Sequence, residues 1–205
     1  MGTPRPHKKV LADLKASILS PALTSHFQCW FYPPPLVRSL LTTEEGDDRF
    51  ISLSCSEAAL PGTSLATNEM VNDHTGVTER HAYRRQYDAT SSFTFYVDHD
   101  YTMLTFFEKW IGFIVNEPNL DLSERSEAGL NNDNYFYRVN FPKEYQTAIY
   151  IKKFEKDYNN GNMIQYKFLK SYPVSIDSMP VTYDASQVLK CTVNFNFSRY
   201  WVETT

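Results

Sequence analysis

Three neighbouring residues, Asp98, His99 and Asp100, form the one cluster in the sequence whose residue types suit acid–base or metal chemistry. Two carboxylates beside an imidazole can bind a divalent cation or transfer a proton. Adjacent residues of a strand or turn, however, direct their side chains apart. A helical apolar pattern starts directly after them, and the first turn of a helix needs a short side-chain oxygen as its cap. We therefore expect Asp98 or Asp100 to cap a helix and do not assign a site here.

Sequence patterns of other catalytic or metal sites are absent. The five histidines have neither HExxH nor another metal-ligand spacing. The closest pair of glycines, Gly62 and Gly76, is too far apart for a P-loop or a dinucleotide fingerprint, and the residues after Gly62 do not complete a nucleophile elbow. We predict no catalytic residue, no metal ion and no cofactor.

The three cysteines, Cys29, Cys55 and Cys191, are far apart and include no CxxC pair. This spacing argues against a disulfide framework and against a zinc ribbon. We expect them to be small buried apolar residues in a reducing compartment.

The charge of the chain argues against tight nucleic-acid binding. Lysine and arginine number 20 and aspartate and glutamate 24, a formal net charge of −4. Residues 150–154 and 166–170 do interleave lysines with aromatic residues, as a sheet that binds single strands can. Strand alternation gives the same pattern, with the apolar members in the core and the lysines solvated. We favour that interpretation because the chain has no dense basic stripe.

The composition indicates one ordered domain rich in strands. The chain has 205 residues, of which 42% are hydrophobic and 15% aromatic. Aromatic residues at this level favour strands. Predicted strands cover residues 25–32, 49–56, 92–97, 146–154, 163–172, 174–184 and 188–201. In the last of them we expect one buried face, made of Cys191, Val193, Phe195, Phe197 and Trp201, opposite a polar face with Lys190, Thr192, Asn194, Asn196 and Ser198.

One amphipathic helix is predicted over residues 101–115. Met103, Phe107, Trp110, Ile111 and Ile114 recur on one face of it. This stretch is the most apolar of the chain, but it contains charged residues and is too short to span a bilayer, so we expect no membrane insertion. Residues 1–24 are expected to form an N-terminal helix or arm, and residues 25–205 one β domain with long polar loops at 61–85 and 117–145.

The order of these elements resembles the tail tube proteins of contractile-tailed bacteriophages, the T-even-like myovirus family. The resemblance runs from about Ser25 to Val202 and rests on short motifs in a fixed order. These are Phe27-Gln28, then Ala59-Leu60-Pro61-Gly62, Tyr83-Arg84-Arg85, the strand at Phe93–Val97 before a helix with Phe107 and Trp110, Tyr172-Pro173-Val174-Ser175-Ile176, and Val193-Asn194-Phe195-Asn196-Phe197. The arm at 1–24 and the enlarged 33–48 and 117–145 regions depart from the shorter members.

The resemblance implies a mainly β fold, a β-sandwich or partial barrel of two packed antiparallel sheets with one flanking helix. It implies hexameric rings that stack into a tube within a sheath. The implied location is the virion tail, assembled in the cytoplasm of the host bacterium. The implied partners are further copies of the chain, the tail sheath protein, the tape measure protein, and the baseplate and tail terminator proteins. DNA would pass through the lumen without specific binding.

The resemblance also suggests which residues make contacts. The 61–85 region would reach a neighbouring subunit or ring through Asn68, Glu69, Arg80, Arg84 and Arg85. Glu108 and Lys109 would lie on the side of the helix that faces the sheath. Asn194, Asn196 and Ser198 are candidates for the lumen, because a polar wall without basic residues would not retain phosphates.

Three other functions stay open at this stage. A baseplate tube initiator, or the tube of a related injection particle, would share the same core. A monomeric β-sandwich that binds carbohydrate or peptide would fit the aromatic content. An enzyme whose site is assembled from distant residues would leave no sequence motif.

Overall fold

The computed structural model describes residues 22–38, 52–72, 76–115, 139–155, 163–184 and 187–204. Most of the predicted arm at 1–24, residues 39–48 of the enlarged 33–48 region and residues 117–138 of the predicted second loop lie outside the described residues. The elements, in chain order, are β1 (Phe27–Phe31), α2 (Pro35–Arg38), β2 (Cys55–Ala58), β3 (Thr63–Asn72), β4 (Val77–Tyr87), β5 (Thr90–Tyr96), α4 (Thr102–Val115), α6 (Pro142–Tyr145), β6 (Thr147–Phe154), β7 (Met163–Ile176), β8 (Lys190–Asn196) and β9 (Arg199–Thr204).

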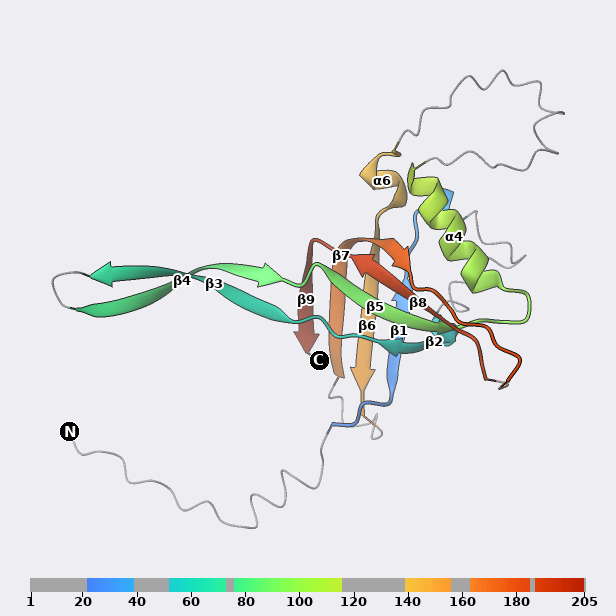
Figure 1. Ribbon diagram of the computed structural model, residues 1–205, viewed down its shortest axis with the longest axis horizontal. Coiled ribbons are helices and arrows are strands. Elements are labelled where there is room, and N and C mark those ends of the chain that lie inside the picture. The colour runs from blue at the N-terminus through green and yellow to red at the C-terminus, as the bar shows by residue number, and fades with distance from the viewer. Residues whose placement is uncertain are drawn as a thin grey trace, which may run out of the picture.

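Two antiparallel sheets pack on each other and share the long strand β7. The first half of β7 lies between β6 and β9, with β1 beyond β6. The second half of β7 pairs with β8, which continues to β5 and β2. Figure 1 shows β5 and β8 crossing over the β1–β6–β7–β9 sheet, with α4 to one side. The predicted mainly β fold with antiparallel sheets and a flanking helix is confirmed, and the described strands do not close into a barrel.

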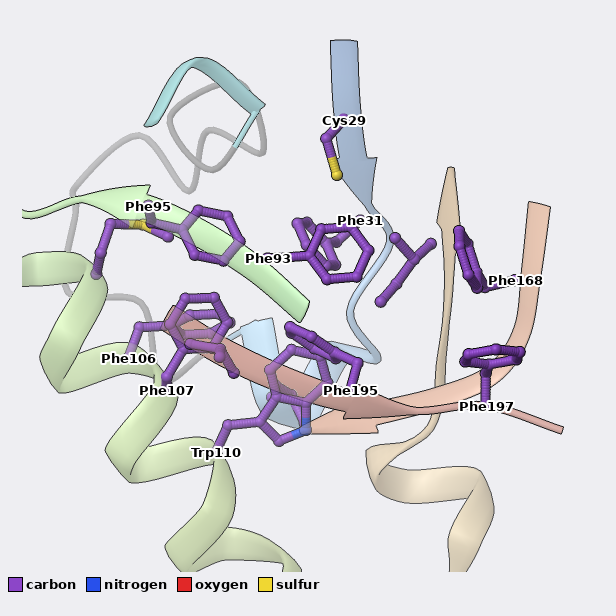
Figure 2. Close-up of a cluster of buried hydrophobic side chains, with 14 of the residues drawn as sticks. Cys29, Phe31, Phe93, Phe95, Phe106, Phe107, Trp110, Phe168, Phe195 and Phe197 are labelled. Carbon is purple, nitrogen blue, oxygen red and sulfur yellow. The ribbon is translucent and has the colours of Figure 1, made fainter. Parts of the chain in front are cut away.

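The core between the sheets is built from aromatic residues (Figure 2). The ring of Phe195 on β8 lies within 6.0 Å, between centroids, of Phe31, Phe93, Phe107 and Trp110. These residues come from both sheets and from α4, and each is at most 1% exposed. Because edge-to-face and tilted ring pairs stabilise beyond the area they bury, this cluster joins the three elements.

Helix α4 begins where the sequence predicts it. The Asp98 carboxylate accepts a hydrogen bond from Thr102 Oγ1 at 2.7 Å and a longer one from the Met103 backbone N–H at 3.4 Å. Burial acts to raise the pKa of Asp98, but the hydrogen bonds from the Thr102 side chain and from backbone N–H groups outweigh it and hold that pKa below its ordinary value. The cap predicted for Asp98 or Asp100 is therefore Asp98.

The buried face of α4 matches the prediction in its first three turns. Met103, Phe107 and Trp110 are fully buried, whereas Ile111 and Ile114 are half-buried. The indole N–H of Trp110 donates to the carbonyl of Tyr145 at 3.2 Å, which fixes the helix to α6.

The largest correction concerns residues 61–85, which we expected to be an irregular loop. Residues 63–72 and 77–85 form most of a β-ribbon, made of β3 and β4, that pairs from Thr63↔Tyr87 to Asn72↔Val77. Nearly all of its side chains are exposed. No apolar alternation marks it, because alternation reflects a buried face and this ribbon has none.

The strands around Pro173 also differ from the prediction. One strand, β7, runs through Pro173 with a bulge between Pro173 and Ser175, and no strand follows at 177–184. In this half β7 pairs only with β8, so the missing N–H of proline falls at a bulge on an open edge.

The predicted last strand, 188–201, is two strands. The chain turns at Phe197 and Ser198, so β8 and β9 belong to different sheets. Cys191, Val193, Phe195 and Phe197 are buried as expected, but Trp201 is 44% exposed and Tyr200 is buried in its place.

Two further expectations are wrong in detail. In the described part of the strand predicted at 49–56, residues 52–54 are helical, the strand begins at Cys55, and Leu53 is 80% exposed. Among the lysines expected to be solvated, Lys153 has a side chain only 15% exposed that pairs with Glu155 at 2.9 Å.

Candidate assembly surfaces

The β3–β4 ribbon projects from the body of the domain (Figure 1). It carries five large hydrophobic side chains that are each more than half exposed, namely Leu65, Met70, Val71, Val77 and Tyr83. A two-stranded hairpin without a covering layer is only marginally stable in water, and both of its edges have unpaired backbone groups. The ribbon therefore has the properties of a segment that packs on another chain.

The base of the ribbon is fixed to the body through polar contacts. The Gly62 backbone N–H donates to Asp88 Oδ2 at 2.5 Å. The Arg85 Nε donates to Thr63 Oγ1 at 2.9 Å within the ribbon, and Arg85 Nη2 donates to the hydroxyl of Tyr200, on β9 of the body, at 3.4 Å. The direction of the ribbon is thus set by the subunit itself.

The predicted contact residues fall into two groups. Arg80 and Glu69 are opposite each other near the middle of the ribbon, with Arg80 Nη2 and Glu69 Oε1 3.6 Å apart and both side chains more than half exposed. Asn68, opposite His81, is also exposed there. Arg84 and Arg85 lie at the base, where Arg85 contacts its own subunit.

The predicted lumen residues are likewise divided. Asn194 and Asn196 are half-buried on the polar face of β8, and the Asn194 side-chain amide donates to Ser175 Oγ at 3.1 Å and Asp177 Oδ1 at 2.8 Å. Ser198 lies in the turn after β8. It lines a shallow hollow of about 520 Å³ at the base of the ribbon together with Arg84 and Arg85.

The face of β5 and β8 that points away from the core is uncharged at its centre. Thr94 and Thr192 face each other there, with their hydroxyl oxygens 3.1 Å apart. Towards the end of these strands Lys190 lies over the ring of Tyr96, at 5.3 Å. Hydroxyl and amide side chains thus make up most of this surface.

Glu108 and Lys109 are both exposed on α4, as a surface role requires. Their contact with a sheath stays a prediction.

Asp98, the member of the Asp98-His99-Asp100 cluster whose contacts are defined, serves as the cap of α4. Within the described ranges, no group of three or more His, Cys, Asp or Glu residues is arranged to hold a metal ion. Burial, with the Glu108 and Asp177 carboxylates, raises the pKa of the Cys191 thiol to about 11, and burial beside Cys55 raises that of Cys29. Protonated thiols are poor nucleophiles. No described helix has both the length and the apolarity of a membrane span.

One surface feature was not singled out by the sequence. On the outer face of the β1–β6–β7–β9 sheet, Trp30, Tyr150, Lys167 and Trp201 lie in register across the four strands. Only the lysine–aromatic interleaving of β6 and β7 could have indicated it, because the pairing of distant strands is needed to align the other two residues.

Comparison with known proteins is consistent with this geometry. The family model described as phage tail tube protein matches residues 22–203. No curated protein matches the chain by sequence.

Solved structures with the same fold come from contractile injection systems. A chain of the PVC sheath–tube complex in the extended state is 12% identical, with a TM-score of 0.55 and coverage of 94% of this chain and 97% of that one. A chain of the anti-feeding prophage baseplate is 9% identical, with a TM-score of 0.57 and coverage of 90% and 96%. A chain of the anti-feeding prophage tube-terminating cap is 13% identical, with a TM-score of 0.55 and coverage of 91% and 93%. The family match over nearly the whole length, together with this fold, shows that the chain is a member of the phage tail tube protein family.

Proposed function

We propose that this protein assembles into hexameric rings, and that the rings stack into the inner tube of a contractile tail. The tube is a conduit through which DNA leaves the particle, and the protein acts by self-assembly and not by catalysis. The observation that carries the proposal is the β3–β4 ribbon, a projecting pair of strands with exposed apolar side chains in a chain of the tail tube family.

The occupant of the ribbon is a second copy of the chain. Among the described residues, the strands β1, β2 and β9 each pair on one side only, so every subunit offers strand edges that an incoming strand can extend. The ribbon of one subunit then covers an edge of the next, and closure of this contact around a ring buries Leu65, Val71 and Tyr83. Arg80 and Glu69, at the exposed middle of the ribbon, supply polar contacts between subunits or rings.

The polar face of β5 and β8 is the surface that we assign to the lumen. Thr94, Thr192, Asn194 and Asn196 present hydroxyl and amide groups. Such a wall does not neutralise phosphates, so DNA passes without the strong, salt-dependent binding that basic surfaces produce. Ser198, in the turn at the ribbon base, would lie at the end of this surface.

The partners follow from the same assembly. The PVC neighbour comes from a sheath–tube complex, and other neighbours come from a baseplate and a terminating cap. By analogy we propose a tail sheath protein outside the tube, near Glu108 and Lys109, with baseplate and terminator proteins at its ends and a tape measure protein inside. Assembly would take place in the cytoplasm of the host bacterium.

Removal of the ribbon tests the proposal. A variant that lacks Asn68 to Glu79 is expected to keep the fold of the body, measured by circular dichroism, and to sediment as a monomer, whereas the intact chain forms rings or tubes. A deletion variant that assembles with unchanged yield and length would show that the ribbon has no role in assembly.

A tube initiator of the baseplate is the second candidate. The chain superposes about equally well on the chain of the anti-feeding prophage baseplate, with a TM-score of 0.57, and on the chain of the PVC sheath–tube complex, with a TM-score of 0.55. The two roles differ in stacking, because a tube protein adds ring on ring whereas an initiator forms one layer that starts the tube.

A further inference from the structure

The outer face of the β1–β6–β7–β9 sheet carries a continuous row of side chains, here called the aromatic–lysine row: Trp30, Tyr150, Lys167 and Trp201. The rings of Trp30 and Tyr150 are stacked, with centroids 5.6 Å apart and planes 5° from parallel. The Lys167 ammonium lies 5.2 Å from the ring centre of Tyr150 and 5.9 Å from that of Trp201. A single cation is thus held between two aromatic rings at the middle of an open sheet face.

Stacking and cations occupy faces of the Tyr150 and Trp201 rings, so at these two residues the ring edges are the more available part for a ligand. Tyr150 has Trp30 on one side and Lys167 over its ring, while the Arg199 guanidinium lies 5.2 Å from the centre of Trp201. Sugars and nucleic-acid bases bind to free aromatic faces, so the row is poorly suited to either. Aromatic edges carry partial positive charge, and indole N–H and phenol O–H groups are donors. The row therefore favours a ligand with negative charge and many acceptors.

Further cations surround the row. Lys152 follows Tyr150 by two residues on β6 and therefore lies on the same face of the sheet. Arg199 precedes Trp201 by two residues on β9 and lies on that face as well. Among the described residues, no carboxylate pairs with Lys152, Lys167 or Arg199. One acidic residue, Glu203, is nearby, across from Gln165. The surface is thus locally basic on a chain whose net charge is −4.

The basic surface continues into a shallow groove at one end of the sheet. The groove has a volume of about 680 Å³ and is lined by Tyr32, Tyr150, Lys143, Lys170 and neighbouring residues. Tyr32 contacts Tyr150 edge to face at 5.5 Å, so groove and row share a wall. Together they form a strip whose cations include Lys143, Lys170, Lys167 and Arg199.

We propose that this strip is a docking surface for an acidic segment of a partner protein, whose carboxylates pair with Lys167, Lys152 and Arg199 and whose backbone lies along the groove. The chemistry of the occupant is inferred from the strip alone. Its assignment to the sheath around the tube rests on the proposed function.

The experiment measures binding to the isolated chain by fluorescence anisotropy. The probe is a labelled glutamate-rich peptide, and the same peptide with glutamine in place of glutamate is its neutral counterpart. Lys167→Glu is expected to weaken binding of the acidic peptide by about tenfold or more, because it places a like charge at the centre of the strip. Lys167→Gln, which keeps most of the side-chain stem, is expected to weaken it by a smaller factor.

The matched control is Lys190→Glu. Lys190 also lies over a tyrosine ring, that of Tyr96, but on the other sheet. This variant makes the same change in net charge and is expected to alter the affinity by about twofold or less. Circular dichroism and the melting temperature establish that each variant is folded.

Four results would overturn the proposal: no binding by the unmodified chain, equal losses for Lys167→Glu and Lys190→Glu, equal binding of the neutral peptide, or tighter binding of a single-stranded oligonucleotide of the same charge. Ring formation is scored separately by microscopy of Lys167→Glu. Loss of peptide binding with intact rings supports the docking surface. Peptide binding by an unmodified chain that forms no rings, even when a baseplate nucleus is supplied, contradicts the tube and leaves the surface in place.

Discussion

Gly62 and Asp88 join the two ends of the β3–β4 ribbon: the Gly62 backbone N–H donates a hydrogen bond of 2.5 Å to Asp88 Oδ2. The contact lies where the chain leaves the body of the domain and where it returns. A ribbon that meets a neighbouring subunit must leave at a defined angle, so this pair links a local hydrogen bond to the geometry of assembly.

Gly62→Ala is expected to disturb this junction. A Cβ atom at Gly62 would lie 2.8 Å from Asp88 Oδ2, so the carboxylate must move and the hydrogen bond weakens. We expect a loss of about 1 kcal/mol in the local opening free energy of the ribbon base, measured by hydrogen exchange. Gly112→Ala is the control, because a Cβ there meets nothing within 4 Å and alanine is the better residue in a helix. Equal exchange in the two variants would contradict the role of Gly62.

Phe195→Ala is expected to be severely destabilising. The Phe195 ring contacts rings from both sheets and α4 and is 1% exposed. Its removal leaves a cavity at the point where three elements meet, with an expected loss of about 3–5 kcal/mol in the free energy of unfolding, measured with denaturant. Tyr183→Ala removes a fully exposed ring and should change the stability by less than about 0.5 kcal/mol. Similar losses for both would contradict this description of the core.

Asp98 is expected to give stability a defined pH dependence. Its pKa is held below the ordinary value in the folded protein, so its contribution is present above the ordinary carboxyl pKa and is lost as the pH falls through the lower, folded-state pKa. Asp98→Ala should cost about 1 kcal/mol at neutral pH, as the loss of a helix cap does, and progressively less in acid. Thermal unfolding of both proteins across this pH range measures it. Asp100→Ala, beside the cap, should have little effect, and a pH-independent cost of Asp98→Ala would contradict the assignment.

Charge reversal at Arg80 and Glu69 distinguishes a contact within one subunit from a contact between subunits. Their side chains are 70% and 53% exposed, so the pair itself should contribute less than about 1 kcal/mol to folding. Arg80→Glu is expected to leave the melting temperature nearly unchanged and to reduce the yield of assembled particles in sedimentation. The double variant Glu69→Arg, Arg80→Glu restores the pair within the ribbon. If it also restores full assembly, the two residues act only inside their own subunit.

The sequence predicts best those parts of the fold where one face is buried. The alternation of Phe93 and Phe95 indicates β5, and the helical repeat of Met103, Phe107 and Trp110 indicates α4, because burial in the same subunit imposes both patterns. Apolar periodicity does not indicate the β3–β4 ribbon, because in our proposal its side chains are covered only by another copy of the chain. One signal that the sequence offers is Gly76, directly before β4, which has a φ of +66°.

Prediction from the sequence also fails where a strand changes sheet. Pro173 indicates a break, yet β7 continues through a bulge because the proline occupies an open edge. Trp201 continues the alternation of β8 in the sequence, but the turn at Ser198 reverses which face is buried. The same reversal turns Trp201 outward into the aromatic–lysine row, whose four residues are aligned only by the pairing of four strands.

The central claim is self-assembly into a hollow conduit, and negative-stain electron microscopy of the chain expressed alone tests it most directly. We expect rings with six subunits and an open centre, or tubes built from them, with projections of the ribbon between neighbouring subunits. A chain that stays monomeric at all concentrations, with no rings even when a baseplate nucleus is supplied, would contradict it.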